Sequence, residues 1–359
     1  MATNPLTELQ ALGQSVWLDS IRRSYVQPGG YLTQLIDAGE IDGLTSNPTI
    51  FEGALAKEAS YAEQLRELAG ADPREAFWEL MTTDLKAAAD AFLPLYRESG
   101  GTKGFVSIEV DPAKAFDTEA TVADGLHLYH TMDRPNLMVK VPGTEPGLAA
   151  ITRLLAEGVH VNVTLLFNVT RYEAVAQAYL DGLQQRAEQN KNLSAVSSVA
   201  SFFVSRVDSK VDAILGEDHP LHAKAAIANA RAAYGSFQRI FNGPEFAELA
   251  AAGARVQRPL WASTSTKNPK LSDVLYVEAL AGPDTVNTMP EATIDATRDQ
   301  ATAADNLTDT ADDARKTLDE LAAEGIDLTQ ITKELEAEGV DKFVASFESA
   351  VETVAEHVG

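Results

Sequence analysis

The chain has 359 residues, with 53 acidic and 29 basic side chains, which gives a formal net charge of −24. So acidic a surface argues against nucleic acid and anionic membranes as partners, although a locally positive pocket could still bind a small anion. The absence of cysteine excludes disulfides, thiol nucleophiles and cysteine-type zinc sites. The start MATNPLTELQ lacks the basic and apolar segments of a secretory signal, and no apolar run is long enough to span a bilayer, so we expect a cytoplasmic protein with no membrane partner.

Short apolar segments bounded by turn residues predict eight strands, at residues 16–19, 43–46, 105–110, 137–142, 161–165, 199–203, 258–263 and 285–289. Between them lie helix-like stretches, for example at 145–158, 168–190 and 222–252. Strands that alternate with helices are typical of parallel βα units. Eight such units predict a closed (β/α)8 TIM barrel of the α/β class, with an open doubly wound sheet as the alternative.

Two segments are additional to a minimal barrel. Residues 50–100 predict two or three helices inserted after the second strand, and the chain from Asn306 onward predicts further helices at the C-terminus. In this tail, Phe343, Phe347 and Val351 have the spacing of a buried helix face. We expect these helices to pack on the barrel, so that residues 1–359 form a single domain.

The alternation of side chains along each strand separates an apolar face from a polar one. In the fifth predicted strand, Val161, Val163 and Leu165 share one face, while Asn162 and Thr164 share the other. The apolar faces are expected to meet the helices. The opposite faces of the strands, together with residues that directly follow a strand, contain a set of polar side chains: Asp19, Asn47, Glu109, Lys140, Asn162, Thr164, Ser201 and Ser263.

Lys140 lies within the apolar stretch LMVKVP, and burying an ammonium is costly unless it is paired or loses its proton. Each polar residue has an ordinary explanation when taken alone: a salt bridge for Lys140, a cap for Asp19, structure for the serines and threonines. One lysine, two acids and several small polar groups on one face are instead typical of a site. A neutral lysine forms Schiff bases with carbonyls, carboxylates move protons, and amides bind hydroxyls. The pattern indicates a Schiff-base aldolase-type enzyme.

Several motifs, in order along nearly the whole chain, resemble those of transaldolases. They are GLTSNPTIF (43–51), SIEVDP (107–112), LMVKVPGT (137–144), VNVTLLF (161–167), SFFVSRVDSKVD (201–212), LWASTSTKNP (260–269) and TVNTMPEATIDA (285–296). The chain is most similar to the longer bacterial branch, which is also found as the transaldolase part of fusions with glucose-6-phosphate isomerase. The resemblance implies a transferase of the pentose phosphate pathway with no metal and no organic cofactor. We expect a monomer or a homodimer, and the sequence shows no interface that would decide between them.

The resemblance also implies a role for each matching residue. Lys140 matches the Schiff-base lysine. Glu109 matches the acid that works with a bound water, and Thr164 the residue that holds this water. Asp19 matches the acid/base that handles the C4 hydroxyl proton of the substrate. The remaining residues match those that bind the substrate. Asn47 and Asn162 match amides that hold the substrate hydroxyls, and Ser201 and Phe203 match residues of the pocket wall. Arg206 matches the arginine that binds the substrate phosphate.

One region departs from the pattern of shorter transaldolases, which have a serine–aromatic–arginine–asparagine run after the seventh strand. Here the sequence reads ASTSTKNP, and Lys267, with Ser263 beside it, is the candidate to replace the second phosphate arginine. Lysine binds phosphate as a point charge, without the fork of arginine. The alternative is that Lys267 is only a loop cation. Arg258 is also near, but it begins its strand and so belongs to the wrong end of a barrel.

The implied reaction is a transfer. A ketose phosphate, such as sedoheptulose 7-phosphate or fructose 6-phosphate, condenses with Lys140. Its dihydroxyacetone unit then passes to an aldose phosphate, such as glyceraldehyde 3-phosphate or erythrose 4-phosphate. Three alternatives stay open: a fructose-6-phosphate aldolase-type class I aldolase, a non-catalytic barrel that binds sugar phosphates, and a metal-dependent aldolase. The last is disfavoured because the six histidines form no HxH or HExxH pair.

Overall fold

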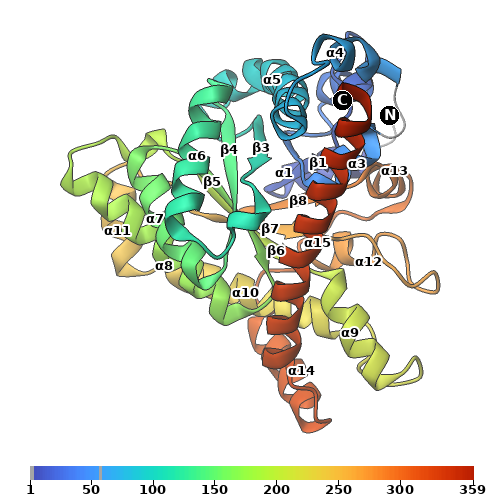
Figure 1. Cartoon of the computed structure of the whole chain (residues 1–359). Helices are drawn as coiled ribbons and strands as arrows, with labels where there is room; N and C mark the ends of the chain where they lie inside the picture. The colour runs from blue at the N-terminus through green and yellow to red at the C-terminus, as the bar shows by residue number, and fades with distance from the viewer. Residues whose placement is uncertain (1–3, 56–58) are drawn as a thin grey trace.

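The computed structural model describes residues 4–55 and 59–359. Its centre is a closed barrel in which eight parallel strands follow one another in chain order (Figure 1). The strands are β1 Gln14–Asp19, β2 Gly43–Thr45, β3 Phe105–Glu109, β4 Leu137–Pro142, β5 His160–Leu166, β6 Ser198–Phe203, β7 Arg258–Ala262 and β8 Thr285–Met289. The predicted (β/α)8 barrel is therefore confirmed over the open sheet. No helix in the described part of the chain is long and apolar enough to cross a membrane.

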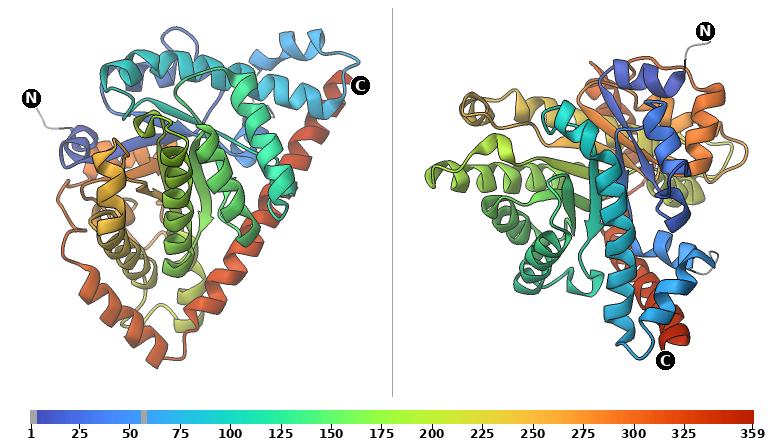
Figure 2. Two further views of the ribbon diagram at one scale, coloured as in Figure 1. Left: turned by 90° about the vertical axis from the view of Figure 1, so that its left-hand side faces the viewer. Right: turned by 90° about the horizontal axis from the view of Figure 1, so that it is seen from above.

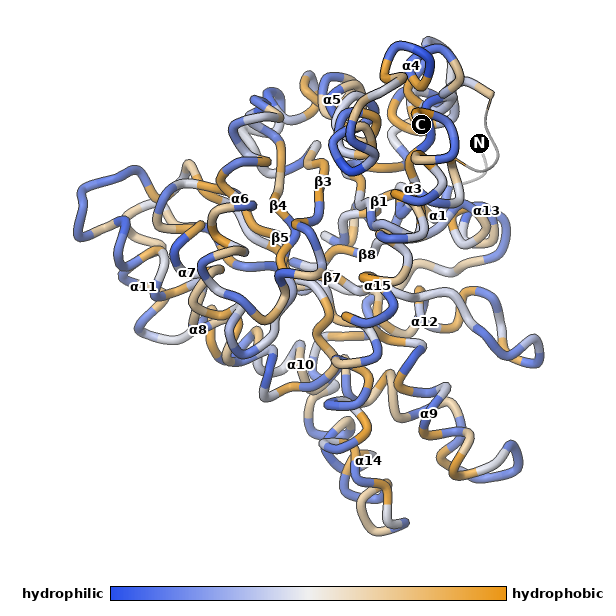
Figure 3. The backbone as a smooth tube through the Cα atoms, viewed as in Figure 1, coloured by the Kyte–Doolittle hydropathy of each residue, from blue (hydrophilic) through white to orange (hydrophobic). Residues whose placement is uncertain are grey.

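Helices surround the barrel in the three views of Figures 1 and 2. They are α1 Pro5–Ala11, α2 Tyr31–Asp37, α3 Pro48–Leu55, α4 Ala62–Glu67, α5 Pro73–Glu98, α6 Thr118–Met132, α7 Glu145–Glu157, α8 Val169–Glu188, α9 Ser205–Leu215, α10 Ala225–Phe241, α11 Pro244–Ala251, α12 Leu275–Ala279, α13 Glu291–Gln300, α14 Ala311–Ala323 and α15 Leu328–Val358. The central strands are mostly hydrophobic, whereas the outer helices alternate in hydropathy (Figure 3). The insertion after β2 consists of α3, α4 and α5, and the C-terminal extension of α14 and α15.

The expectation of one helix over residues 222–252 is wrong. Helix α10 ends at Phe241 and α11 begins at Pro244, with Asn242 and Gly243 between them. Proline lacks the N–H that a continuing helix needs, but it fits the first position of a new helix.

The strand register brings the predicted polar residues into neighbouring positions. Glu109 of β3 is opposite Lys140 of β4, and Lys140 is opposite Asn162 of β5. Asp19 of β1 is opposite Thr45 of β2. Parallel strands in register present the same face at paired positions, so these side chains share the barrel interior near the C-terminal strand ends.

Strand β5 contains an irregularity that the alternation did not predict. Its register with β6 shifts between Val163 and Leu166, and Leu165 has a left-handed φ of 62°. The expectation that Leu165 shares a face with Val161 and Val163 is wrong for this reason. A Cβ built on Gly339 of α15 would lie 3.0 Å from the Leu165 side chain, so the bulge directs Leu165 against the C-terminal helix.

The long helix α15 crosses the barrel at the C-terminal strand ends, where it contacts α3, α9 and β5 (Figures 1 and 2). Thr49 Oγ1 of α3 donates a hydrogen bond to Ser346 Oγ of α15 at 2.8 Å. Phe347 is buried and packs edge-on against Phe77 of α5, with ring centroids 4.8 Å apart. The helix is thus docked on the insertion and closes over the mouth of the barrel.

The first turn of α7, which follows β4, depends on a glycine. Thr144 caps α7 by accepting a hydrogen bond from the Gly147 amide at 3.1 Å. A Cβ on Gly147 would lie 2.2 Å from the Pro142 carbonyl oxygen, which is a backbone atom that cannot turn aside. We therefore expect Gly147→Ala to lower the free energy of unfolding by about 1–3 kcal/mol in urea titrations.

Gly53→Ala in α3 is the matched control, because nothing lies within 4 Å of the added Cβ. Alanine favours a helix over glycine by up to about 1 kcal/mol, so this variant should be as stable as the parent or slightly more stable. Equal stability losses in the two variants would contradict the role of the Gly147 contact.

Candidate active site

A cavity of about 240 Å³ opens at the C-terminal ends of the strands. Nine of the eleven residues predicted from the sequence line it: Asp19, Asn47, Lys140, Thr164, Ser201, Phe203, Arg206, Ser263 and Lys267. The other two, Glu109 and Asn162, are buried beside it at the positions paired with Lys140. The structure therefore brings all eleven into one region, although they come from several segments far apart in sequence.

Lys140 is 4% exposed. Its Nζ atom lies 3.2 Å from Glu109 Oε2 and donates a hydrogen bond to the Ser46 carbonyl oxygen at 3.2 Å. The Phe343 ring of α15 covers the amine, with Nζ 5.5 Å from the ring centroid. The amine is thus held in place, sheltered from water and directed into the cavity.

Two carboxyl groups share the electrostatic environment of Lys140. Burial raises the pKa of Glu109, and the nearby negative charge of Asp19 raises it further, while Lys140 opposes both effects. Burial also raises the pKa of Asp19, against the charge of Lys140 and a 2.6 Å hydrogen bond from Thr45. Carboxyl groups with raised pKa values can serve as proton donors as well as acceptors near neutral pH.

A layer of small polar side chains supports the cavity floor. Asn162 donates a hydrogen bond to Ser107 Oγ at 3.0 Å and accepts one from Ser201 Oγ at 2.7 Å. These bonds fix the amide next to Lys140 and leave one of its N–H groups free for another acceptor. Thr164 Oγ1 is buried and has no hydrogen-bond partner among the described residues, so it can bind an oxygen atom in the cavity.

Asn47 follows β2 and caps helix α3. Its Oδ1 accepts a hydrogen bond from the Ile50 amide at 3.1 Å. Because the carbonyl oxygen is occupied in this way, the side-chain amide is the group that Asn47 can offer to the cavity as a donor.

The opposite end of the cavity is cationic. Arg206 lies in the first turn of α9, with its guanidinium carbon 5.3 Å from the Phe203 ring centroid. The Ser205 and Ser263 hydroxyls are 2.9 Å apart, which ties the start of α9 to the end of β7. Lys267 donates a hydrogen bond to Ser265 Oγ at 2.8 Å. Burial and the charges of Arg206 and Lys342 lower the pKa of Lys267.

Nine further residues that line the cavity were not predicted as site residues, and four of them contact or flank the predicted ones. Thr45 and Thr288 bond to each other through hydroxyls 2.6 Å apart, and the alternation rule applied to β2 and β8 could have found them. Phe343 was expected only as part of a buried helix face. Lys342, beside it, carried no sequence signal at all, because its position depends on where α15 docks.

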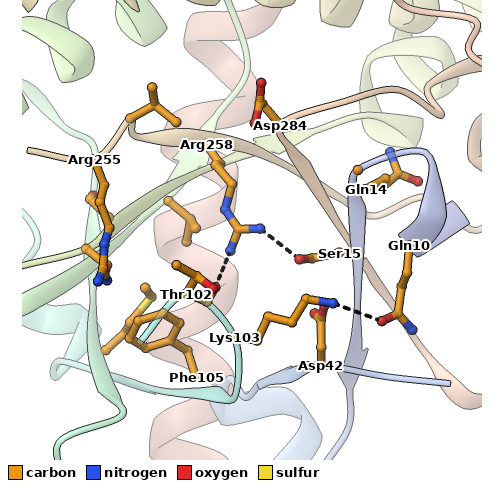
Figure 4. A pocket seen from close by; sticks show the side chains of 16 residues that line it. Gln10, Gln14, Ser15, Asp42, Thr102, Lys103, Phe105, Arg255, Arg258 and Asp284 are labelled. Atoms are coloured by element: carbon orange, nitrogen blue, oxygen red, sulfur yellow. Dashed lines mark hydrogen bonds and ion pairs between the residues drawn. The ribbon is translucent and has the colours of Figure 1, made fainter. Parts of the chain in front are cut away.

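Arg258 lies at the opposite end of the barrel, as its place at the start of β7 predicts. It lines a second cavity of about 280 Å³ and donates to Ser15 Oγ at 2.7 Å (Figure 4). Lys103 in the same cavity pairs with Asp42 at 3.1 Å. Within residues 4–55 and 59–359, no three histidine, aspartate or glutamate side chains are placed to hold a metal ion together.

Comparison with known proteins identifies the family. Residues 16–354 match the family described as transaldolase/fructose-6-phosphate aldolase. The chain is 49% identical to a transaldolase of Saccharopolyspora erythraea, over 100% of this chain and 99% of the relative. It is 48% identical to a transaldolase of a Parafrankia species and 47% identical to one of Thermobifida fusca, each over 99% of this chain.

The raised pKa of Asp19 makes a pH-dependent prediction. Between the ordinary aspartate pKa of about 4 and the raised value, the folded chain binds more protons than the unfolded chain, so the wild type loses stability as the pH rises. Asp19→Asn removes this loss. The variant should be more stable than the wild type at pH 8, with an advantage that shrinks toward pH 4 in urea titrations.

Asp319→Asn is the control, because Asp319 is exposed on α14. Its stability difference from the wild type should not grow with pH as that of Asp19→Asn does. If the Asp19→Asn difference were the same at pH 4 and pH 8, Asp19 would not titrate with a raised pKa.

Proposed function

The chain belongs to the transaldolase/fructose-6-phosphate aldolase family, and we propose that it is a transaldolase that transfers a dihydroxyacetone unit between sugar phosphates through a Schiff base on Lys140. The observation that carries this proposal is the polarity of the cavity. One end has a buried amine in contact with Glu109 and within the electrostatic reach of Asp19, and the other has Arg206 and Lys267. The amine end suits a carbonyl group, and the cationic end suits a phosphate group. A sugar phosphate carries both groups.

The first half of the reaction uses Lys140 as nucleophile. Its neutral amine attacks the ketose carbonyl, and loss of water from the carbinolamine gives a protonated imine. Asp19 takes the proton from the C4 hydroxyl, the C3–C4 bond breaks, and the bonding electron pair moves to the imine as an enamine. The aldose phosphate leaves. The second half reverses these steps with another aldose phosphate as acceptor.

Glu109 is proposed to handle the protons of imine formation. It lies 3.2 Å from the Lys140 amine, and its raised pKa suits both proton uptake and release. Thr164, buried and unpartnered among the described residues, is proposed to hold the water that Glu109 uses. Asn47 and Asn162 offer N–H donors to the substrate hydroxyls and the enamine, while Ser201 and Phe203 shape the wall.

The phosphate end explains why the departing and arriving aldoses both carry phosphate. Arg206 is proposed to bind it as a fork, Lys267 as a point charge and Ser263 through its hydroxyl. The same anchor then positions each aldose carbonyl over the enamine. We place this reaction in the pentose phosphate pathway of the cytoplasm, with sedoheptulose 7-phosphate or fructose 6-phosphate as donor.

The second candidate is an aldolase that releases dihydroxyacetone to water, because the matched family covers both activities. Acceptor dependence separates them. A transaldolase should consume fructose 6-phosphate at a steady rate only when an acceptor such as glyceraldehyde 3-phosphate is present. Steady release of free dihydroxyacetone without acceptor would favour the aldolase.

Lys140→Met is expected to abolish turnover, by on the order of 10³-fold or more, because Lys140 is the amine of the cavity that lies beside Glu109 and Asp19. Methionine fills the buried space, and Glu109 can take a proton to remain neutral, so the fold should persist. Coupled assays with fructose 6-phosphate and erythrose 4-phosphate measure activity, and circular dichroism checks the fold. Appreciable turnover by the folded variant would reject the mechanism.

Glu109→Gln is expected to slow imine formation by roughly 10²–10⁴-fold while changing substrate binding much less, since a proton shuttle acts in the transition state. Single-turnover trapping with borohydride measures the rate of imine formation over a range of fructose 6-phosphate concentrations. A loss of binding with unchanged chemistry would show that Glu109 only supports the pocket.

A further inference from the structure

The C-terminal helix adds a cation to the phosphate end of the cavity. Lys342 of α15 lines the same cavity as Arg206 and Lys267. The three residues come from distant segments: the start of α9, the loop after β7 and the middle of α15. Asp19 is the single acidic residue that lines this cavity among the described residues, and it lies beside Lys140. The acidic side chain of the cavity is therefore coupled to Lys140, whereas the charges that act on Lys267 are those of Arg206 and Lys342.

These three cations also lack the partners that cations usually have. No carboxylate of the described residues lies within ion-pair distance of Arg206, Lys267 or Lys342, and Glu338, whose charge acts on Arg206, is paired with Lys210. Three adjacent unpaired cations repel one another, which is unexpected in a chain with a net charge of −24. Such a cluster is stabilised when an anion binds.

The cavity at the other end of the barrel provides a comparison within the same molecule. There, Lys103 pairs with Asp42, and Arg258 donates to Ser15 while the charges of Asp42 and Asp284 act on it (Figure 4). Two carboxylates, Asp42 and Asp284, thus line that cavity beside its cations. The end of the cavity at Arg206, Lys267 and Lys342 differs, because no carboxylate of the described residues lines it beside these cations, which favours the binding of an anion there.

Helix α15 holds Lys342 in a defined position. The neighbouring Phe343 is buried over Lys140, and Ser346 and Ser349 bond to Thr49 and Glu52 of α3 at 2.8 and 2.6 Å. Lys342 itself is exposed at the cavity rim, where a long flexible lysine can reach a phosphate without a desolvation cost in the free enzyme.

We propose that Lys342 is a third phosphate-binding residue of the substrate site, contributed by the C-terminal helix beside Arg206 and Lys267. This inference rests on the proposed function for the identity of the ligand as a sugar phosphate. It makes α15 part of the substrate site as well as a structural cover, since one turn of it presents Phe343 to the amine and Lys342 to the phosphate.

The test compares Lys342→Met with Lys333→Met, which removes an exposed lysine from the same helix outside this cavity. Calorimetric titration with inorganic phosphate and steady-state kinetics with fructose 6-phosphate are measured for both. We expect Lys342→Met to raise the Kd for phosphate and the KM for fructose 6-phosphate about tenfold, and Lys333→Met to stay within twofold of the wild type. Lys342→Arg should restore most of the binding, because it restores the charge.

The outcomes separate this inference from the proposed function. Loss of phosphate affinity in Lys342→Met supports the inference even if the wild type proved unable to turn over fructose 6-phosphate, which would overturn the proposed function alone. A folded Lys342→Met with unchanged Kd and KM would overturn the inference while the proposed function stands. If the wild type did not bind phosphate, the inference about Lys342 would be overturned as well.

Discussion

The buried ion pair between Lys140 and Glu109 is the interaction on which the rest of the site depends. Taking charged groups out of water costs several kcal/mol per ion, and the attraction between two groups 3.2 Å apart opposes this penalty. Asp19 adds a second acid to the same region, and burial raises the pKa of both carboxyl groups. A core with this composition is poorly suited to stability alone. It is well suited to a reaction in which one amine alternates between charged, neutral and imine forms while protons move between neighbours.

The barrel and the C-terminal helix provide what this interaction requires. Strand register fixes Glu109, Lys140 and Asn162 side by side, so their relative positions depend on backbone hydrogen bonds rather than on flexible loops. The β5 bulge places Leu165 against Gly339, which lets α15 approach closely. The helix then presents the Phe343 ring to the Lys140 amine. The same docking that covers the Lys140 amine places Lys342 at the end proposed to bind phosphate.

Local sequence patterns predicted the strands and placed most of the candidate residues at one end of the barrel, because a period of two identifies which residues share the barrel interior. Predicted strand 199–203 differs by one residue from β6, Ser198–Phe203. Local sequence patterns did not predict features that depend on contacts between distant segments of the chain. The left-handed backbone at Leu165 has no glycine to signal it, and the position of Lys342 follows from the packing of α15 on α3. The break before α11 could have been predicted from the sequence, because Gly243 and Pro244 mark it. The alanine-rich composition on both sides of these residues instead favoured the prediction of one helix.

The central claim is that the Lys140 amine forms an imine with a ketose phosphate. The most direct measurement is to incubate the protein with fructose 6-phosphate, reduce it with borohydride and locate the adduct by peptide mass spectrometry. We expect a three-carbon adduct without phosphate on Lys140, since cleavage leaves the dihydroxyacetone unit on the enzyme. A folded, substrate-binding protein with no adduct on Lys140 would contradict the claim, and this lysine would then be a structural partner of Glu109 in a sugar phosphate-binding barrel.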